Sequence, residues 1–145
     1  QEHPLVEGEK LGVVGHSYGG NTVLFQGALD ERIKFACSSG AACSYQTKIN
    51  QETGIEMAEV IPGFADKFEI VDLVNCFAPR DLLLISATKD KYSQDAGKIF
   101  ANAKDAFTRL GAGDNLTYKE YEGQHALTEE RFKFIVDWLL AECKH

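Results

Sequence analysis

Four short apolar runs, separated by stretches with helical periodicity, dominate the hydrophobic pattern of the chain. The runs cover residues 11–14, 33–38, 81–87 and 116–122. Runs of this length, bounded by glycine or charged residues, predict buried β-strands. The first run is rich in β-branched residues, as expected of a strand buried on both faces of a parallel sheet. The fourth run is more polar and is expected at an edge of the sheet.

Helical patterns lie between and after these runs. A stripe of mostly small residues follows the first run and predicts a helix packed closely against the sheet: Gly20, Val23, Leu24, Gly27 and Ala28. A second helix is predicted over residues 69–77. A third is predicted from Ser93, as its N-cap, to Leu110. Thr128 is expected to cap the last helix, whose buried face includes Trp138.

Strands that alternate with helices in this way form right-handed crossovers. The expected fold class is therefore α/β, with a parallel sheet of about four strands and helices on both faces. With 145 residues, the chain forms one domain or part of one. Residues 1–10 are expected to form a loop. Residues 41–67 lack periodicity and are expected to pass irregularly over the C-terminal edge of the sheet, either shaping a binding pocket or forming an ordinary surface loop.

The sequence Gly15-His16-Ser17-Tyr18-Gly19 follows the first run and fits the G-x-S-x-G pattern of a nucleophile elbow. In such an elbow a strand turns sharply into a helix, and the strained backbone presents the serine hydroxyl to substrate. Side chains on either side of the turn would collide, so Gly15 and Gly19 are expected to leave the room that a Cβ would fill. His16 is expected to pack beside the elbow rather than to react.

A serine hydroxyl needs a base to take its proton and an acidic group to orient that base. Asp90 follows the third apolar run and His125 follows the fourth, so both are expected in loops at the same rim of the sheet as Ser17. The order serine, aspartate, histidine is the one that this type of elbow requires. Asp95 is the alternative acid, and Asp90 is preferred for its distance from the strand.

Composition narrows the expected partners. Fifteen basic and 22 acidic residues give a formal net charge of −7, and the basic residues are scattered, so neither a nucleic acid nor a membrane is expected as a partner. The first residues do not resemble a signal segment. Four irregularly spaced cysteines indicate buried, reduced thiols of a cytoplasmic protein rather than a disulfide or metal set: Cys37, Cys43, Cys76 and Cys143. Neither a metal nor a cofactor is expected.

Three segments together resemble the C-terminal half of an α/β-hydrolase: the GHSYGG elbow, residues 78–90 (APRDLLLISATKD) and residues 122–125 (EGQH). The chain is most similar to the dienelactone-hydrolase-like and acetyl-xylan-esterase-like group, in which A-P-R before a buried strand and a G-T-x-D acid turn are common. Ala87 stands in place of the usual glycine. True dienelactone hydrolases use a cysteine nucleophile, so Ser17 favours an esterase-type relative.

The resemblance implies that the backbone N–H of Tyr18 donates one hydrogen bond to the oxyanion. A second donor and the early strands of the sheet are expected outside this chain, which would make residues 1–145 a partial α/β-hydrolase domain. Loss of one oxyanion donor typically costs about 2.7–4 kcal/mol. The chain alone is therefore expected to be a poor catalyst, and the missing N-terminal half or a second copy is a candidate for association.

The predicted function is a serine hydrolase that cleaves a small-molecule carboxylic ester through an acyl-enzyme. Ser17 would attack the carbonyl carbon, His125 would transfer the proton, and Asp90 would orient the imidazole. Two alternatives remain open. One is a prolyl-oligopeptidase-type serine peptidase, whose catalytic domain has a similar elbow, acid turn and histidine loop. The other is a hydrolase fold that serves as a non-catalytic binding module.

Overall fold

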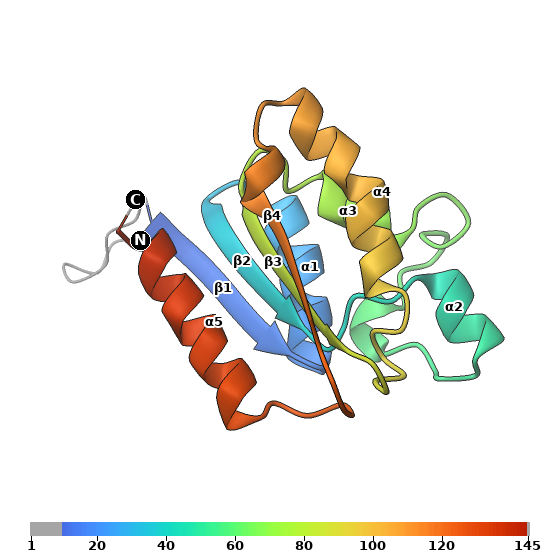
Figure 1. Cartoon of the computed structure of the whole chain (residues 1–145). Coiled ribbons are helices and arrows are strands. Elements are labelled where there is room, and N and C mark those ends of the chain that lie inside the picture. Colours follow the sequence, from blue (N-terminus) through green and yellow to red (C-terminus); the bar gives the residue numbers. More distant parts are fainter. Residues whose placement is uncertain (1–9, 145) are drawn as a thin grey trace.

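The computed structural model describes residues 10–144 and contains a four-stranded, fully parallel sheet (Figure 1). The strands lie side by side in the order of the sequence: β1 (Leu11–His16), β2 (Ile33–Ser39), β3 (Asp81–Ala87) and β4 (Leu116–Tyr121). This arrangement confirms the predicted α/β fold class. The loop predicted for residues 1–10 lies, except for Lys10, outside the described residues.

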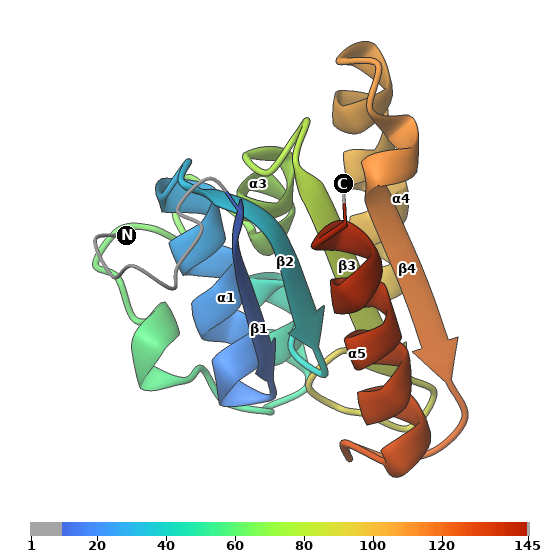
Figure 2. The ribbon, with the colours of Figure 1, turned by 90° about the vertical axis from the view of Figure 1, so that its left-hand side faces the viewer.

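Helices cover both faces of the sheet, as predicted (Figures 1 and 2). One face packs against α1 (Tyr18–Leu29), α3 (Ile70–Asn75) and α4 (Ala96–Arg109), and the other packs against α5 (Glu129–Glu142). Successive residues of a strand point to opposite faces. Leu82 and Leu84 of β3 therefore join the first core, whereas Leu83 and Ile85 join the second. This two-sided burial explains why β3 has an almost continuous apolar sequence.

The structure corrects the prediction for the first strand. β1 lies at one edge of the described sheet and β4 lies at the other, as predicted for β4. Val14 of β1 is 50% exposed, so this strand is not buried on both faces. Its β-branched composition is that of a central strand, and an edge position in this chain agrees with the expectation that the early strands of the sheet lie outside it.

The predicted N-cap residue is confirmed for one helix and is wrong for another. The Thr128 hydroxyl accepts a hydrogen bond from the backbone N–H of Arg131 and caps α5, as predicted. Ser93 does not cap α4, which instead begins after Asp95. The Ser93 hydroxyl is buried and donates to Asp90, so the carboxylate after β3 competes successfully for a hydroxyl that would otherwise suit a helix start.

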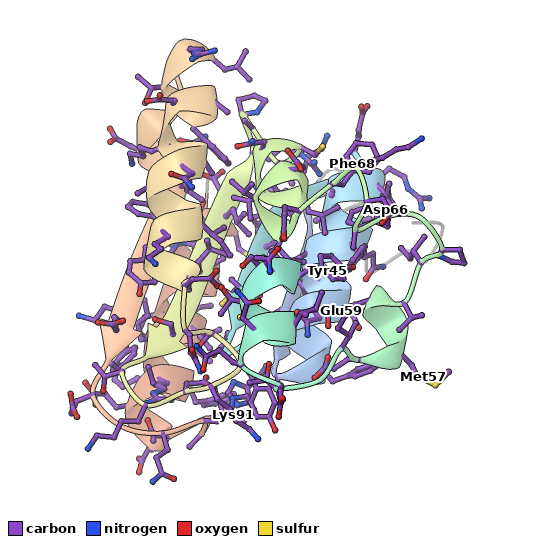
Figure 3. All side chains as sticks on the ribbon, turned by 90° about the vertical axis from the view of Figure 1, so that its right-hand side faces the viewer. Tyr45, Met57, Glu59, Asp66, Phe68 and Lys91 are labelled. Atoms are coloured by element: carbon purple, nitrogen blue, oxygen red, sulfur yellow. The ribbon has the colours of Figure 1, made fainter. Side chains whose placement is uncertain are left out.

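The segment over residues 41–67 is held in place by buried polar contacts. It contains α2 (Tyr45–Asn50) and a 3-10 turn, η2 (Met57–Glu59). Lys48 and Glu59 form a buried ion pair. The Tyr45 hydroxyl donates to the Glu59 carbonyl over 2.7 Å, and Figure 3 labels both of these residues. Glu56 accepts a 2.7 Å hydrogen bond from the Asn21 amide in α1. The first two contacts hold the segment together, and the bond from Asn21 attaches it to the helix that follows Ser17.

Two further elements complete the description. A short 3-10 turn, η3 (Gly113–Asn115), leads into β4. All four cysteines are free thiols; Cys37 and Cys43 are buried, as predicted, whereas Cys76 and Cys143 are exposed. None of the helices within residues 10–144 has the length and hydrophobicity needed to cross a bilayer.

Candidate active site

Ser17 lies at a sharp turn between β1 and α1. Its backbone has φ 57° and ψ −125°, a conformation that L-residues with a Cβ rarely adopt. The Ser17 N–H donates a 2.8 Å hydrogen bond to the Ser39 carbonyl at the end of β2, and its own carbonyl accepts from Gly20 and Asn21 in α1. The strained residue is therefore held on both sides by regular secondary structure, as a nucleophile elbow requires.

The glycines around this turn differ from the prediction in one respect. A Cβ at Gly15 would lie 2.2 Å from the backbone carbon of Gly19, so a side chain cannot fit at position 15. A Cβ at Gly19 would meet nothing within 4 Å, and the predicted steric need for that glycine is wrong. The second close approach occurs at Gly20, where a Cβ would lie 2.7 Å from the Ala41 Cβ and 2.9 Å from the Ser39 carbonyl oxygen.

The structure brings Ser17, Asp90 and His125 together at the C-terminal ends of the strands. Ser17 Oγ lies 2.7 Å from His125 Nε2, and His125 Nδ1 lies 3.0 Å from Asp90 Oδ2. Ser17 follows one edge strand and His125 follows the other, so the segment after β4 must return across the sheet; Figure 1 shows it running from β4 back toward α5 and β1. The arrangement is that of a hydroxyl, a base and an orienting acid in series.

Asp90 is 1% exposed and accepts hydrogen bonds from three groups. Oδ1 accepts from the Tyr92 N–H at 2.9 Å, whereas Oδ2 accepts from the Ser93 hydroxyl at 2.9 Å and from His125. The alternative acid, Asp95, instead accepts from the hydroxyls of Ser44 and Thr47 at 2.5 and 2.7 Å. Asp95 thus anchors the start of α2, and Asp90 is the carboxylate beside the histidine.

Arg131 of α5 holds the loop that carries His125. This side chain is 3% exposed, and its guanidinium donates to the carbonyls of Gln124 at 3.0 Å and Ala126 at 2.5 Å. A third, longer bond reaches the Glu122 carbonyl at 3.4 Å. The bonded carbonyls lie on both sides of His125 in the sequence, so one buried arginine positions the whole loop. Sequence reasoning missed this residue because an arginine in the first turns of a helix usually faces solvent.

Gly40 is a second residue that sequence reasoning missed. It follows β2 with φ +62°, and a Cβ there would lie 3.0 Å from His16 Cε1, 3.1 Å from His125 Cε1 and 3.2 Å from Asp90 Oδ2. The backbone at this position therefore forms part of the wall against which the histidine and the carboxylate pack. The only available signal was a glycine directly after a predicted strand, at the rim where the other loops meet.

His16 packs beside the elbow, as expected, and does so against the ring of His125. The two imidazoles are stacked with their centroids 4.9 Å apart and their planes at 22°. His16 Nδ1 lies 3.0 Å from Ser39 Oγ. Partial burial, followed by the proximity of His125, lowers the pKa of the His16 imidazole below its usual value, although Asp90 opposes this shift.

Tyr18 is the first residue of α1, so its backbone N–H has no acceptor within the helix. The aligned peptide dipoles also give this end of the helix a partial positive charge. An oxyanion formed on a carbonyl attacked by Ser17 would thus meet a suitable donor. Among the described residues, no group of three or more histidine, cysteine or acidic side chains is placed to hold a metal ion.

Comparison with known proteins identifies similar folds among esterases. No protein-family model matches the chain. The carbohydrate esterase MZ0003, from an unknown prokaryotic organism, is 28% identical and aligns with 74% of this chain and 29% of its own length. A CE15 glucuronoyl esterase from Caldicellulosiruptor kristjansonii superposes with a TM-score of 0.78 at 20% identity, covering 98% of this chain and 45% of that one. A structure from Bacteroides fragilis NCTC 9343 assigned as an acetyl xylan esterase gives 0.74 at 17% identity, covering 99% and 45%.

The chain spans less than half the length of each of these proteins. At such identities, the superpositions establish the fold and leave the activity to be argued from the site itself. They bear out the resemblance to acetyl-xylan-esterase-like proteins and add glucuronoyl esterases to it. The architecture of this chain is the α/β-hydrolase fold, which it shares with these esterases.

Proposed function

We propose that this chain carries the catalytic triad of a serine hydrolase that cleaves carboxylic esters, with a carbohydrate-borne ester as its substrate class. The observation that carries the proposal is the series of two hydrogen bonds from Ser17 Oγ to His125 Nε2 and from His125 Nδ1 to Asp90 Oδ2. The esterase names of the similar proteins support an ester rather than a peptide substrate, and a carbohydrate as the group that carries it.

The mechanism follows from the positions of these atoms. His125 Nε2 accepts the Ser17 proton as Oγ attacks the ester carbonyl, while Nδ1–H donates to the ionised Asp90 and fixes the tautomer. The Tyr18 N–H at the start of α1 stabilises the oxyanion of the tetrahedral intermediate. The imidazolium then protonates the leaving alcohol, and an acyl group remains on Ser17. Water, deprotonated by His125, releases the acid and regenerates the serine.

The test measures two reactions, in this chain and in any longer protein that carries it. The first is covalent labelling by a fluorophosphonate probe, which requires an activated serine and little else of a substrate pocket. The second is hydrolysis of p-nitrophenyl acetate. Ser17→Ala should abolish labelling and reduce hydrolysis to the rate of the buffer. Turnover that survives this substitution would refute the role of Ser17, and a wild-type protein that neither labels nor hydrolyses would favour a non-catalytic binding module.

A further inference from the structure

The His125 ring has aromatic neighbours whose role the triad does not explain. His16 stacks on it at a centroid distance of 4.9 Å, and Tyr92 approaches it at 4.8 Å with its plane inclined by 65°. One neighbour precedes the nucleophile and the other follows the acid by two residues. The base is therefore contacted by a side chain from each of the two segments that also supply its hydrogen-bond partners.

We propose that His16 is a positioning residue for His125, holding the face of its ring while Tyr92 contacts the same ring at a steep angle. This inference rests on the proposed function, because it assigns a role within the same site. The His125 ring is attached through Cγ to a loop and hydrogen-bonded through its two nitrogens, so it can still tilt when that loop shifts. Contact with the face of the ring removes that freedom, and His16 supplies such a contact.

His16 is itself well anchored for this task. It is the last residue of β1, and its Nδ1 lies 3.0 Å from the hydroxyl of Ser39, which is 1% exposed at the end of β2. The support for the base is thus built on two strands of the sheet rather than on the loop that carries His125. Residues on regular elements hold a geometry more rigidly than residues on loops.

The charge state of His16 suits the same role. Partial burial lowers the pKa of His16, which favours the neutral form of its ring beside the base. A neutral aromatic face attracts an adjacent cation, whereas a second imidazolium would repel it. The other groups that face this pair are Asp90, which accepts from His125 Nδ1, the Tyr92 ring and the guanidinium of Arg131, whose charge further disfavours protonation of His16.

The experiment compares His16→Ala with His16→Phe in the chain described here. Phenylalanine keeps an aromatic face but has neither a titratable nitrogen nor a bond to Ser39, whereas alanine removes the face altogether. We measure the second-order rate of fluorophosphonate labelling between pH 5 and 9, the downfield proton resonance of His125 Nδ1–H, and the melting temperature. Wild-type protein and Ser17→Ala serve as references.

We expect His16→Ala to slow labelling by about three- to tenfold, to move the acid limb of the rate profile toward lower pH and to broaden the Nδ1–H resonance. His16→Phe should label within about twofold of the wild-type rate. The acid limb of its rate profile should stay at the same pH, and its Nδ1–H resonance should stay sharp. The inference is overturned if alanine labels like the wild type, or if both variants lose rate equally while the acid limb does not move. If neither the wild-type chain nor a longer protein that carries it labels, the proposed function fails. The resonance then still decides whether His16 orders the ring.

Discussion

Gly40 lies so close to His125 that an added Cβ would stand 3.1 Å from the imidazole Cε1. The same atom would crowd His16 and Asp90, at 3.0 and 3.2 Å. Three side chains of the site thus pack on one stretch of backbone after β2, a strand that contributes no member of the triad. The backbone at Gly40 therefore helps to set the positions of the base and the acid.

Substitution of this glycine tests the relationship. Gly40→Ala should slow fluorophosphonate labelling by roughly ten- to a hundredfold, because displacement of the base and acid by a few tenths of an ångström disturbs proton transfer. The control is Gly63→Ala, which has a similar φ of +73° but open space around the added Cβ. Both variants should lose about 1–2 kcal/mol of unfolding free energy from the left-handed backbone, measured in urea. Equal labelling by the two variants would contradict the role of Gly40.

The assignment of the acid leads to a second prediction. Asp90→Asn should reduce ester hydrolysis on the order of 10⁴-fold, since an amide in place of the carboxylate favours the wrong tautomer of His125. Asp95→Asn should retain the labelling rate and instead lower the melting temperature, because Asp95 accepts from Ser44 and Thr47 at the start of α2. The opposite outcome, in which only the Asp95 variant loses labelling, would show that Asp95 and not Asp90 is the acid that orients His125.

A third prediction concerns the loop of the base. Arg131→Met should lower the unfolding free energy by about 1–3 kcal/mol, because the carbonyls of Gln124 and Ala126 lose a charged donor. Labelling should slow at the same time, and hydrogen exchange should speed up over residues 122–128. Lys133→Met is the control on the same helix, since its bond to Asp137 is solvent-exposed and contributes little. Unchanged exchange in the Arg131 variant would show that the loop holds its shape without the guanidinium.

The cysteines give a fourth prediction, which is independent of catalysis. Burial raises the pKa of the Cys37 thiol to about 12, and burial together with the carboxylate of Asp95 raises that of Cys43 to about 12. Since the thiolate is the reactive form, both should resist iodoacetamide at pH 8–9. Cys76 and Cys143 are exposed and should react. Mass spectrometry should find two modified cysteines in the folded protein and four in urea; early modification of Cys37 would contradict this packing.

Sequence reasoning predicted which three side chains meet at the candidate site better than it predicted the residues around them. The strand before Ser17, the loop after β3 and the loop after β4 could be predicted because strand periodicity, the elbow motif and chain order are local signals. The partners of those residues could not. Arg131 and Gly40 act through contacts that only the folded chain brings together, and no pattern in their own neighbourhoods marks them.

The errors have the same origin. Val14 has a sequence suited to a central strand, but its exposure depends on which strands pair. Ser93 suits a helix start, yet the nearby Asp90 takes its hydroxyl. Gly19 belongs to the motif, whereas the space around it depends on how the chain leaves the turn, and the close contact falls on Gly20 instead. The local sequence indicates what structure each residue prefers, and tertiary contacts decide which preferences are realised in the fold.

The hydrogen bond between Ser17 and His125 joins residues 108 positions apart, from the loops after the two outermost strands. Forming a contact of such long range carries a large entropic cost of loop closure, and it depends on the strand pairings that lie between the two residues. A serine activated through this hydrogen bond would therefore exist only in molecules in which the four described strands have paired. Reaction at Ser17 then reports on the folding of the entire chain, and the appearance of reactive hydroxyl during refolding would time its final step.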